Sequence, residues 1–177
     1  MRVKPLIAVP LIALALAGCS AQQPVPQQNS VSVEEKPLFA SDEEALAAAQ
    51  AAYANYLEVS DQIARDGGAN PERLNGLVTS VQYSSELENY RSYSQAGLHA
   101  SGTSTFDSFH ISNPDLENFS AYVCVDVSSS RVIDFSGKDV TGVGRADRWP
   151  LVVSFSFDGN GNALISGNET WTGTNFC

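Results

Sequence analysis

The hydrophobic pattern of this chain changes its period once, at Gly97, and this change constrains the fold most. Before Gly97, apolar residues recur every three or four positions, which predicts helices with one buried face. After it, apolar and polar residues alternate, as in half-buried strands. Helices first and strands after predict an α+β fold, with N-terminal helices packed on an antiparallel sheet in a single domain over 41–177.

Three helices are expected before Gly97. The segment 41–44 (Ser-Asp-Glu-Glu) matches a capping box, so the first helix begins after Ser41 and ends at Asp66-Gly67-Gly68. A short second helix opens at 70–72 (Asn-Pro-Glu), because proline is favoured at the first helical position. The third is predicted from about Ser80 to Gln95.

The second half predicts strands at 98–111, 119–127, 149–157 and 163–172. Segment 131–135 either continues the strand 119–127 past a bulge or is separate. The turn 158–162 (Asp-Gly-Asn-Gly-Asn) joins the last two strands into a hairpin. In 119–127 the alternation assigns two faces, Val123, Val125 and Val127 on one, and Tyr122, Cys124 and Asp126 on the other.

The N-terminus has the features of an export signal. Arg2 and Lys4 precede an apolar run over 5–17 that is shorter than the roughly 20 residues needed to span a bilayer. The exit, Leu-Ala-Gly-Cys at 16–19, resembles the bacterial lipobox. That resemblance implies a signal peptide over 1–18, cleavage before Cys19, and lipidation of Cys19 by diacylglycerol and often a further acyl chain. The alternative is an ordinary signal peptide followed by a chance cysteine.

This anchor predicts a protein held by lipid at the extracytoplasmic face of the cell membrane, since two or three acyl chains make anchoring durable. Residues 19–40 are rich in Gln, Pro and Ser and lack an apolar period, which predicts a disordered tether. A flexible chain of this length has an end-to-end distance of about 25 Å.

The charge balance is strongly acidic. Ten Lys and Arg face 20 Asp and Glu, and removing 1–18 leaves 8 against 20, a net charge of −12. Nucleic-acid binding needs clustered basic residues, so nucleic acid is not expected as a partner. Membrane affinity must then come from the acylated Cys19, because an acidic chain gains nothing from anionic lipid.

Cys124 and Cys177 are the two cysteines left once Cys19 carries lipid. An even pair in an oxidising compartment predicts a disulfide, which would attach the C-terminal residue to the sheet. The alternative is two free thiols.

Late segments of the chain carry a family resemblance. The runs 122–127 (Tyr-Val-Cys-Val-Asp-Val), 149–153 (Trp-Pro-Leu-Val-Val) and Trp171 with 175–177 (Asn-Phe-Cys) are similar to small secreted lipoproteins of actinobacterial type. The resemblance implies a cystatin-like cone, a curved antiparallel sheet with N-terminal helices, as in nuclear transport factor two and ketosteroid isomerase. That superfamily contains both enzymes and non-catalytic binding domains, so the fold alone does not choose between them.

An enzyme with this fold uses the interior of the cone. The residues for a possible pocket are Tyr53, Tyr56, Tyr122 and Asp126, with His99 and His110 as further titratable groups. Each also has a structural interpretation: Tyr53 and Tyr56 lie on an apolar helix stripe as core residues do, Asp126 suits a solvent-facing position, and each histidine suits a surface strand position.

The turn after Phe157 has some spacing of a calcium loop. Asp158, Asn160, Asn162 and Glu169 fall at ligand positions, but Ala163 replaces the required glycine. A plain Asp-Gly and Asn-Gly hairpin turn explains the same residues.

Together these observations predict a non-catalytic binding or interaction domain of the cell envelope, whose partner is an envelope protein or a small apolar ligand. No cofactor is expected. The alternative is an isomerase, dehydratase or hydrolase that uses an Asp/His/Tyr set in the cone.

Overall fold

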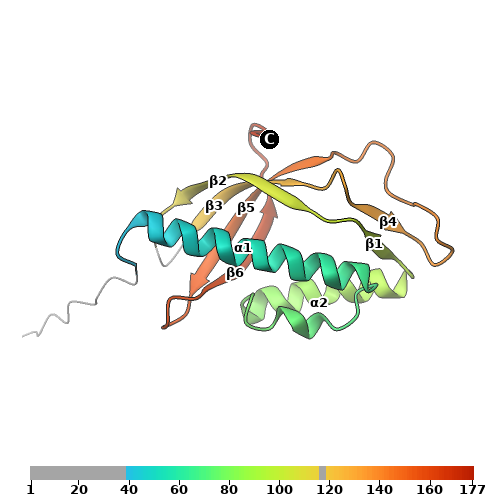
Figure 1. Ribbon diagram of the computed structural model, residues 1–177, viewed down its shortest axis with the longest axis horizontal. Coiled ribbons are helices and arrows are strands. Elements are labelled where there is room, and N and C mark those ends of the chain that lie inside the picture. Colours follow the sequence, from blue (N-terminus) through green and yellow to red (C-terminus); the bar gives the residue numbers. More distant parts are fainter. Residues whose placement is uncertain (1–38, 116–118) are drawn as a thin grey trace, which may run out of the picture. The chain divides into compact units, whose positions relative to one another are not determined.

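The computed structural model describes residues 39–115 and 119–177, which belong to one compact unit of helices packed on antiparallel sheets (Figure 1). The predicted α+β class is therefore confirmed. The elements are α1 (Asp42–Arg65), the 3-10 helix η1 (Pro71–Leu74), α2 (Ser80–Gln95), β1 (His99–Ser101), β2 (Thr105–Asn113), β3 (Ser120–Asp126), β4 (Arg131–Ile133), β5 (Arg148–Phe157) and β6 (Ala163–Thr170).

The first helix begins where the capping box places it. The Ser41 hydroxyl accepts a hydrogen bond from the Glu44 amide at 3.3 Å, and the Glu44 carboxylate accepts one from the Ala40 amide at 2.7 Å. Phe39 packs edge-to-face on Phe157 with ring centroids 4.9 Å apart. Phe39 and Ala40, the last two residues of the predicted tether, thus already contact the folded unit.

The other two helices lie where the sequence predicts them, but one of them is a 3-10 helix rather than an α-helix. The bounds of α2 are as expected, with Thr79 accepting from the Gln82 amide at its start. The second helix is a single 3-10 turn, η1, because the chain leaves it at once to pair with β6. The Thr79 amide donates to the Ile165 carbonyl and the Ile165 amide donates to the Leu77 carbonyl, each at 2.9 Å.

The main sheet has four antiparallel strands in the order β2-β3-β5-β6. Val123 and Val125 on β3 are buried and face α1, as the alternation predicts, while Tyr122 and Asp126 point to the opposite face. The last hairpin also forms, with Phe157 paired to Ala163 across the turn. We call the face toward α1 the inner face and the opposite face the outer face.

The predicted strand 98–111 is wrong as one element, because it breaks into β1 and β2. Gly102 has φ +81° and its Cα lies against the Ser129 carbonyl, where a side chain has no room. The Arg65 guanidinium donates to the Gly102 carbonyl at 3.1 Å, which helps to hold the break against α1. β1 then pairs with β4, so the segment at 131–135 forms a separate strand rather than a continuation of β3.

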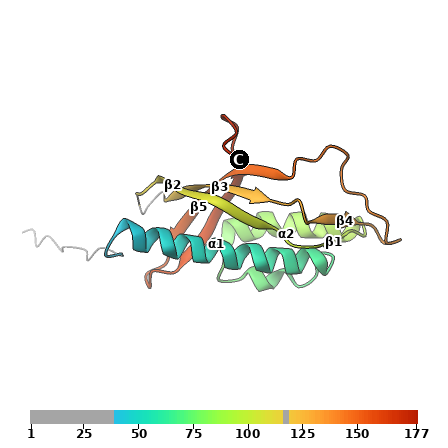
Figure 2. The ribbon, with the colours of Figure 1, turned by 45° about the horizontal axis from the view of Figure 1, so that its top comes forward.

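The core lies between α1 and the inner face of the sheet. Tyr53 packs edge-to-face on Phe106 at 5.0 Å, and Phe155 contacts both Phe109 and Phe119, with ring centroids about 6 Å apart. Burying each such ring stabilises the fold by about 1.5–3 kcal/mol. These side chains pack against one another between α1 and the inner face of the sheet. The helices lie on one side of the sheet and the C-terminal tail on the other (Figure 2).

Candidate functional site

An open aromatic cleft lies on the outer face of the sheet. Strand alternation points Tyr122 on β3 outward, and register places His110 on β2 directly opposite it. Tyr122 pairs with Val152 on β5, and Val152 pairs with Glu169 on β6, so all three side chains point outward. Trp171 lies two residues after Glu169 and therefore also points outward. The cleft has a volume of about 410 Å³ and is lined by Ser108, His110, Tyr122, Trp171, Thr174 and Phe176.

Three aromatic rings form its walls. The Tyr122 ring meets Trp171 at a centroid distance of 5.1 Å and an interplanar angle of 71°, and meets Phe176 at 5.5 Å and 62°. Such edge-to-face contacts stabilise a pair by about 0.5–1.5 kcal/mol beyond burial. Trp171 and Phe176 therefore each stand at a steep angle to Tyr122 rather than stacking parallel to it.

A disulfide holds the C-terminal tail over this face. Cys124 and Cys177 are bonded, with their Cα atoms 5.5 Å apart, so the predicted pairing is confirmed. Cys124 faces outward yet is fully buried, because the tail covers it. The bond thereby places Phe176, its neighbour, beside Tyr122.

Further contacts shape the tail between β6 and the disulfide. The Trp171 amide donates to the Pro150 carbonyl at 2.8 Å, and the Trp171 indole Nε1 donates to the Thr174 carbonyl at 3.1 Å. Gly173 passes so close to the indole ring that a side chain there would collide with it. The indole is therefore wrapped by its own tail and held in one orientation.

The four residues of the possible pocket are not brought together. Tyr53 and Tyr56 are buried on the inner side, in the core, whereas Tyr122 and Asp126 lie on the outer face. The physical reason is strand alternation, since the outward residues of β3 point away from α1. Of the four, Tyr122 alone lines the aromatic cleft.

Asp126 belongs to an ion-pair cluster at one end of the outer face. Arg148 donates to both carboxylate oxygens of Asp107 at 2.7 and 2.8 Å and to Asp126 at 3.2 Å. Hydrogen bonds from Ser128, with a smaller contribution from Arg148, lower the pKa of Asp126, and the Arg148 hydrogen bonds lower that of Asp107. Both carboxylates are therefore ionised at neutral pH and poor proton acceptors.

The structure reveals a partly buried polar cluster that the sequence interpretation missed. The Tyr56 hydroxyl donates to Glu86 on α2 at 2.6 Å and accepts from the Asn168 amide on β6 at 3.4 Å. Burial, and then the charge of Glu86, raise the pKa of Tyr56 well above its ordinary value. A signal was present, because Glu86 is three residues after Tyr83 and four before Tyr90 and so shares their helix stripe.

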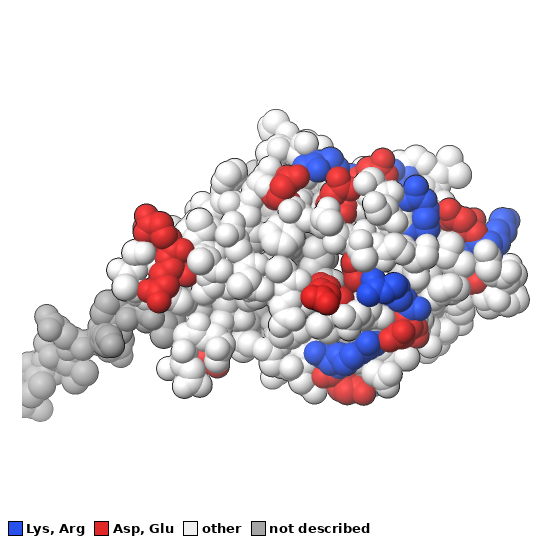
Figure 3. Space-filling model, in the orientation of Figure 1, with Lys and Arg blue, Asp and Glu red and all other residues white. Residues whose placement is uncertain are grey.

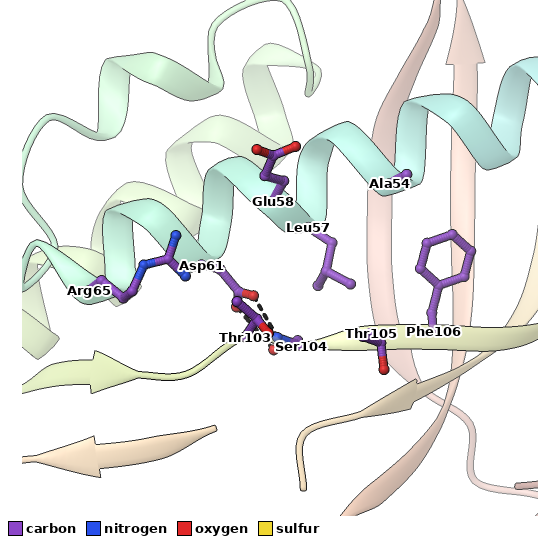
Figure 4. A pocket seen from close by; sticks show the side chains of 9 residues that line it. All are labelled: Ala54, Leu57, Glu58, Asp61, Arg65, Thr103, Ser104, Thr105 and Phe106. Atoms are coloured by element: carbon purple, nitrogen blue, oxygen red, sulfur yellow. Dashed lines mark hydrogen bonds between the residues drawn. The ribbon is translucent and has the colours of Figure 1, made fainter. Parts of the chain in front are cut away.

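A second hollow runs along α1 beside the break between β1 and β2 (Figure 4). It holds about 300 Å³, with Leu57 and Phe106 among its lining residues. Its Asp61 carboxylate accepts from the Ser104 amide at 2.6 Å and from the Ser104 hydroxyl at 3.0 Å. These hydrogen bonds position the start of β2, which gives the polar groups of this hollow a structural role.

A third hollow, of about 600 Å³, lies between α1 and the turn of the last hairpin, and alanines, glycines and Asp158 are among its lining residues. The Asp158 carboxylate accepts hydrogen bonds from the amides of Asn160 and Asn162, each at 2.9 Å. Hydrogen bonds from Asn162 and Asn160 lower its pKa. Asp158 therefore closes its own turn.

The four residues with calcium-loop spacing are not arranged as calcium ligands in the structure. Glu169 lies six residues along β6 from Ala163, a distance of about 20 Å in an extended strand. Asp158, Asn160 and Asn162 form the hairpin turn, so the four predicted ligands do not surround one point. Within residues 39–115 and 119–177, no group of three His, Cys, Asp or Glu is placed to hold a metal ion.

The two histidines lie in different sheets. His99 is on β1, paired with Ile133, and is half-buried, while His110 is exposed in the aromatic cleft.

On the face seen in Figure 3, the Lys and Arg side chains are interspersed with acidic ones and gather away from the start of α1.

Cys19, the predicted signal peptide and most of the predicted tether lie outside the described residues. Among the helices that the structure describes, none combines the length and apolar character that crossing a membrane requires.

Comparisons with known proteins inform the fold alone. No protein-family model and no curated protein matches this chain. Among solved structures, the intermembrane-space region of the chloroplast protein ARC6 is similar, with a TM-score of 0.54 and 9% identity, covering 72% of this chain and 97% of that one. At this identity the likeness supports the α+β architecture.

Proposed function

We propose that this protein is a membrane-anchored, extracytoplasmic binding domain, tethered through lipid on Cys19, whose ligand site is the aromatic cleft on the outer face. The observation that carries the proposal is the contrast between the two faces of the sheet. The inner face is occupied by core aromatics such as Tyr53 and Phe155, whereas the outer face presents an open cleft walled by aromatic rings.

A binding role fits the chemistry of the cleft better than a catalytic one. An acid–base enzyme needs a group whose pKa is tuned toward neutrality beside the substrate. The outer-face carboxylates Asp107 and Asp126 have lowered pKa values and are paired with Arg148. The pKa of the buried Tyr56 is raised well above its ordinary value, so this side chain stays a neutral phenol hydrogen-bonded to Glu86. The environments of Asp107, Asp126 and Tyr56 therefore support the binding role rather than the enzymatic alternative.

We also infer that the sheet curves around α1 in the cystatin-like manner. α1 contacts both β2 and β6, which are the two edge strands of the four-stranded sheet. A sheet whose strands wrap toward the helix makes both of these contacts. The curvature leaves the outer face convex, with the tail and the cleft exposed on it.

Lipid anchoring is tested by Cys19→Ala, with the neighbouring Ser20→Ala as the matched control. The expected result is that Cys19→Ala leaves the precursor uncut or releases the protein to the medium, while Ser20→Ala fractionates with the membrane like the wild type. The measurement is membrane fractionation with mass determination of the N-terminal peptide. Wild-type mobility and fractionation of Cys19→Ala would contradict the anchor.

The site is tested by placing a photo-crosslinking residue at position 110 in intact cells and, as a control, at position 81. His110 lines the cleft, whereas Val81 is 81% exposed on α2, away from it. We expect a discrete envelope adduct from position 110 that is absent from position 81. Equal adduct patterns from the two positions would argue against the cleft as the binding site.

A further inference from the structure

The aromatic cleft has no Asp, Glu, Lys or Arg among its described lining residues, although the chain has a net charge of −10. Its polar groups are the hydroxyls of Ser108, Tyr122 and Thr174 and the imidazole of His110. Hydroxyl groups both donate and accept hydrogen bonds. A cleft of this kind offers neutral hydrogen-bond partners and no ion pair, which favours a neutral, polyhydroxylated ligand.

Charged groups on the same face are already engaged elsewhere. Asp107 accepts two hydrogen bonds from Arg148 and one from the Ser108 hydroxyl at 2.9 Å, so Ser108 is left as an acceptor toward the cleft, and the guanidinium also contacts Asp126. A phosphate, a carboxylate or an ammonium entering the cleft would have to break this cluster to gain a counter-charge. Charged ligands are therefore disfavoured.

The rings of the cleft suit the apolar face of a sugar. A pyranose presents C–H groups on its faces and hydroxyls around its rim, and it packs its C–H face on an aromatic ring. Trp171 and Phe176 each stand at a steep angle to the Tyr122 ring, so a flat ligand can lie against one ring while a neighbouring ring borders its rim. The volume of about 410 Å³ lies in the range of small-molecule sites.

The cleft is also organised before any ligand arrives. The Cys124–Cys177 bond holds Phe176, and the hydrogen bond from Trp171 Nε1 to the Thr174 carbonyl fixes the indole. Rings that are already ordered cost little conformational entropy on binding.

We propose that the aromatic cleft binds a neutral saccharide, with Tyr122, Trp171 and Phe176 as stacking surfaces and Ser108, His110 and Thr174 as hydrogen-bonding groups. This inference rests on the proposed binding function and names its ligand class. A protein partner is the competing occupant, but a stable protein interface needs about 800 Å² per partner, far more than this cleft offers by itself.

The two tryptophans of the chain make a direct test possible. Trp149 pairs with Val125, so it lies on the inner-face side of the sheet, while Trp171 lines the cleft. In the full chain carrying Trp149→Phe, fluorescence reports on Trp171 alone, and in Trp171→Phe it reports on Trp149 alone. The protein is kept in a detergent without a sugar head group, and chitotetraose, cellotetraose and maltotetraose are titrated separately, with tetragalacturonate as the charged control.

The expected result is a saturable change in Trp171 fluorescence with at least one neutral oligosaccharide, with a Kd of about 0.01–1 mM, and no change with tetragalacturonate. Phe176→Leu in the Trp149→Phe background should weaken that binding about tenfold, with circular dichroism confirming the fold. The Trp149 signal of Trp171→Phe should not respond.

Three outcomes would overturn the saccharide assignment. They are no response to any neutral oligosaccharide at about 10 mM, a response of equal size from Trp149, and a response that Phe176→Leu leaves unchanged. If the crosslink from position 110 still yields a discrete protein adduct in cells, the binding function stands and the occupant is a protein. If that adduct is also absent, the proposed function fails as well.

Discussion

Tyr53 and Tyr56 lie three positions apart on α1 and are almost equally buried, but their hydroxyls differ. The Tyr56 hydroxyl bonds to Glu86, whereas the Tyr53 hydroxyl has no hydrogen-bond partner among the described residues. A buried hydroxyl without a partner costs free energy, and a satisfied one contributes modestly. Both residues are buried tyrosines, so the difference comes from the hydrogen-bonding side chains that α2 and β6 place beside Tyr56 and not beside Tyr53.

This difference predicts opposite effects for one substitution. Tyr53→Phe removes an unpaired hydroxyl and should leave the free energy of unfolding unchanged or raise it by up to about 1 kcal/mol. Tyr56→Phe leaves the Glu86 carboxylate without its phenol donor and should lower it by about 1–3 kcal/mol. Urea unfolding of both variants, followed by tryptophan fluorescence, measures the contrast. Equal losses for the two variants would contradict the assignment of hydrogen bonds.

At the scale of elements, the C-terminal tail beyond β6 has no regular structure of its own and depends on its attachment to β3. It carries Trp171 and Phe176, and one covalent bond joins its last residue to Cys124. A terminal segment without such attachment usually frays. The cleft is therefore formed by β3 together with the tail, and the disulfide is the covalent link between them.

Removing the disulfide should consequently affect stability and cleft together. The bond joins residues 53 apart, which corresponds to about 4 kcal/mol in the chain-entropy model. We expect the double variant Cys124→Ala, Cys177→Ala to lose about 2–4 kcal/mol of unfolding free energy, measured in urea. Near-ultraviolet circular dichroism of the folded variant should also lose the signal of the ordered Trp171. A wild-type near-ultraviolet spectrum would show that the tail holds its place without the bond.

For the whole molecule, buried tyrosines set the response to alkaline pH. Burial, with a smaller effect of Glu86, raises the pKa of Tyr53 and of Tyr56, and burial raises that of Tyr90 to about 12. Each phenol ionises near its ordinary value of about 10 in the unfolded chain but stays protonated in the folded one. Their stabilising contribution is therefore fully present below pH 10 and is lost as the pH rises through the folded-state values.

The expected outcome is a free energy of unfolding that falls above pH 10 by up to about 1.4 kcal/mol per pH unit for each tyrosine that remains protonated in the folded chain. Urea titrations between pH 8 and pH 11.5 measure this slope. Tyr90→Phe should reduce the slope, because it removes one phenol whose pKa is raised in the folded chain. A slope that Tyr90→Phe leaves unchanged would assign the alkaline transition to other groups.

Local patterns alone predicted much of this architecture. The cap at Ser41, the bounds of α2 and the alternation in β3 each depend on neighbours within a few residues, and all three are found as expected. The pairing of Cys124 with Cys177 followed from cysteine count and compartment. The strand break at Gly102 was missed, because it depends on Ser129 and on Arg65 of α1, which are distant in sequence.

What the sequence by itself determined is that helices precede strands, which residues of β3 face the core and which face outward, and the pairing of Cys124 with Cys177. The tertiary structure decided the candidate site. It placed Tyr53 and Tyr56 in the core and grouped Tyr122 with Trp171 and Phe176 on the other side of the sheet. The physical reason is that strand register and a covalently held tail bring these rings together over about 50 residues of chain, a distance at which no local pattern carries a signal.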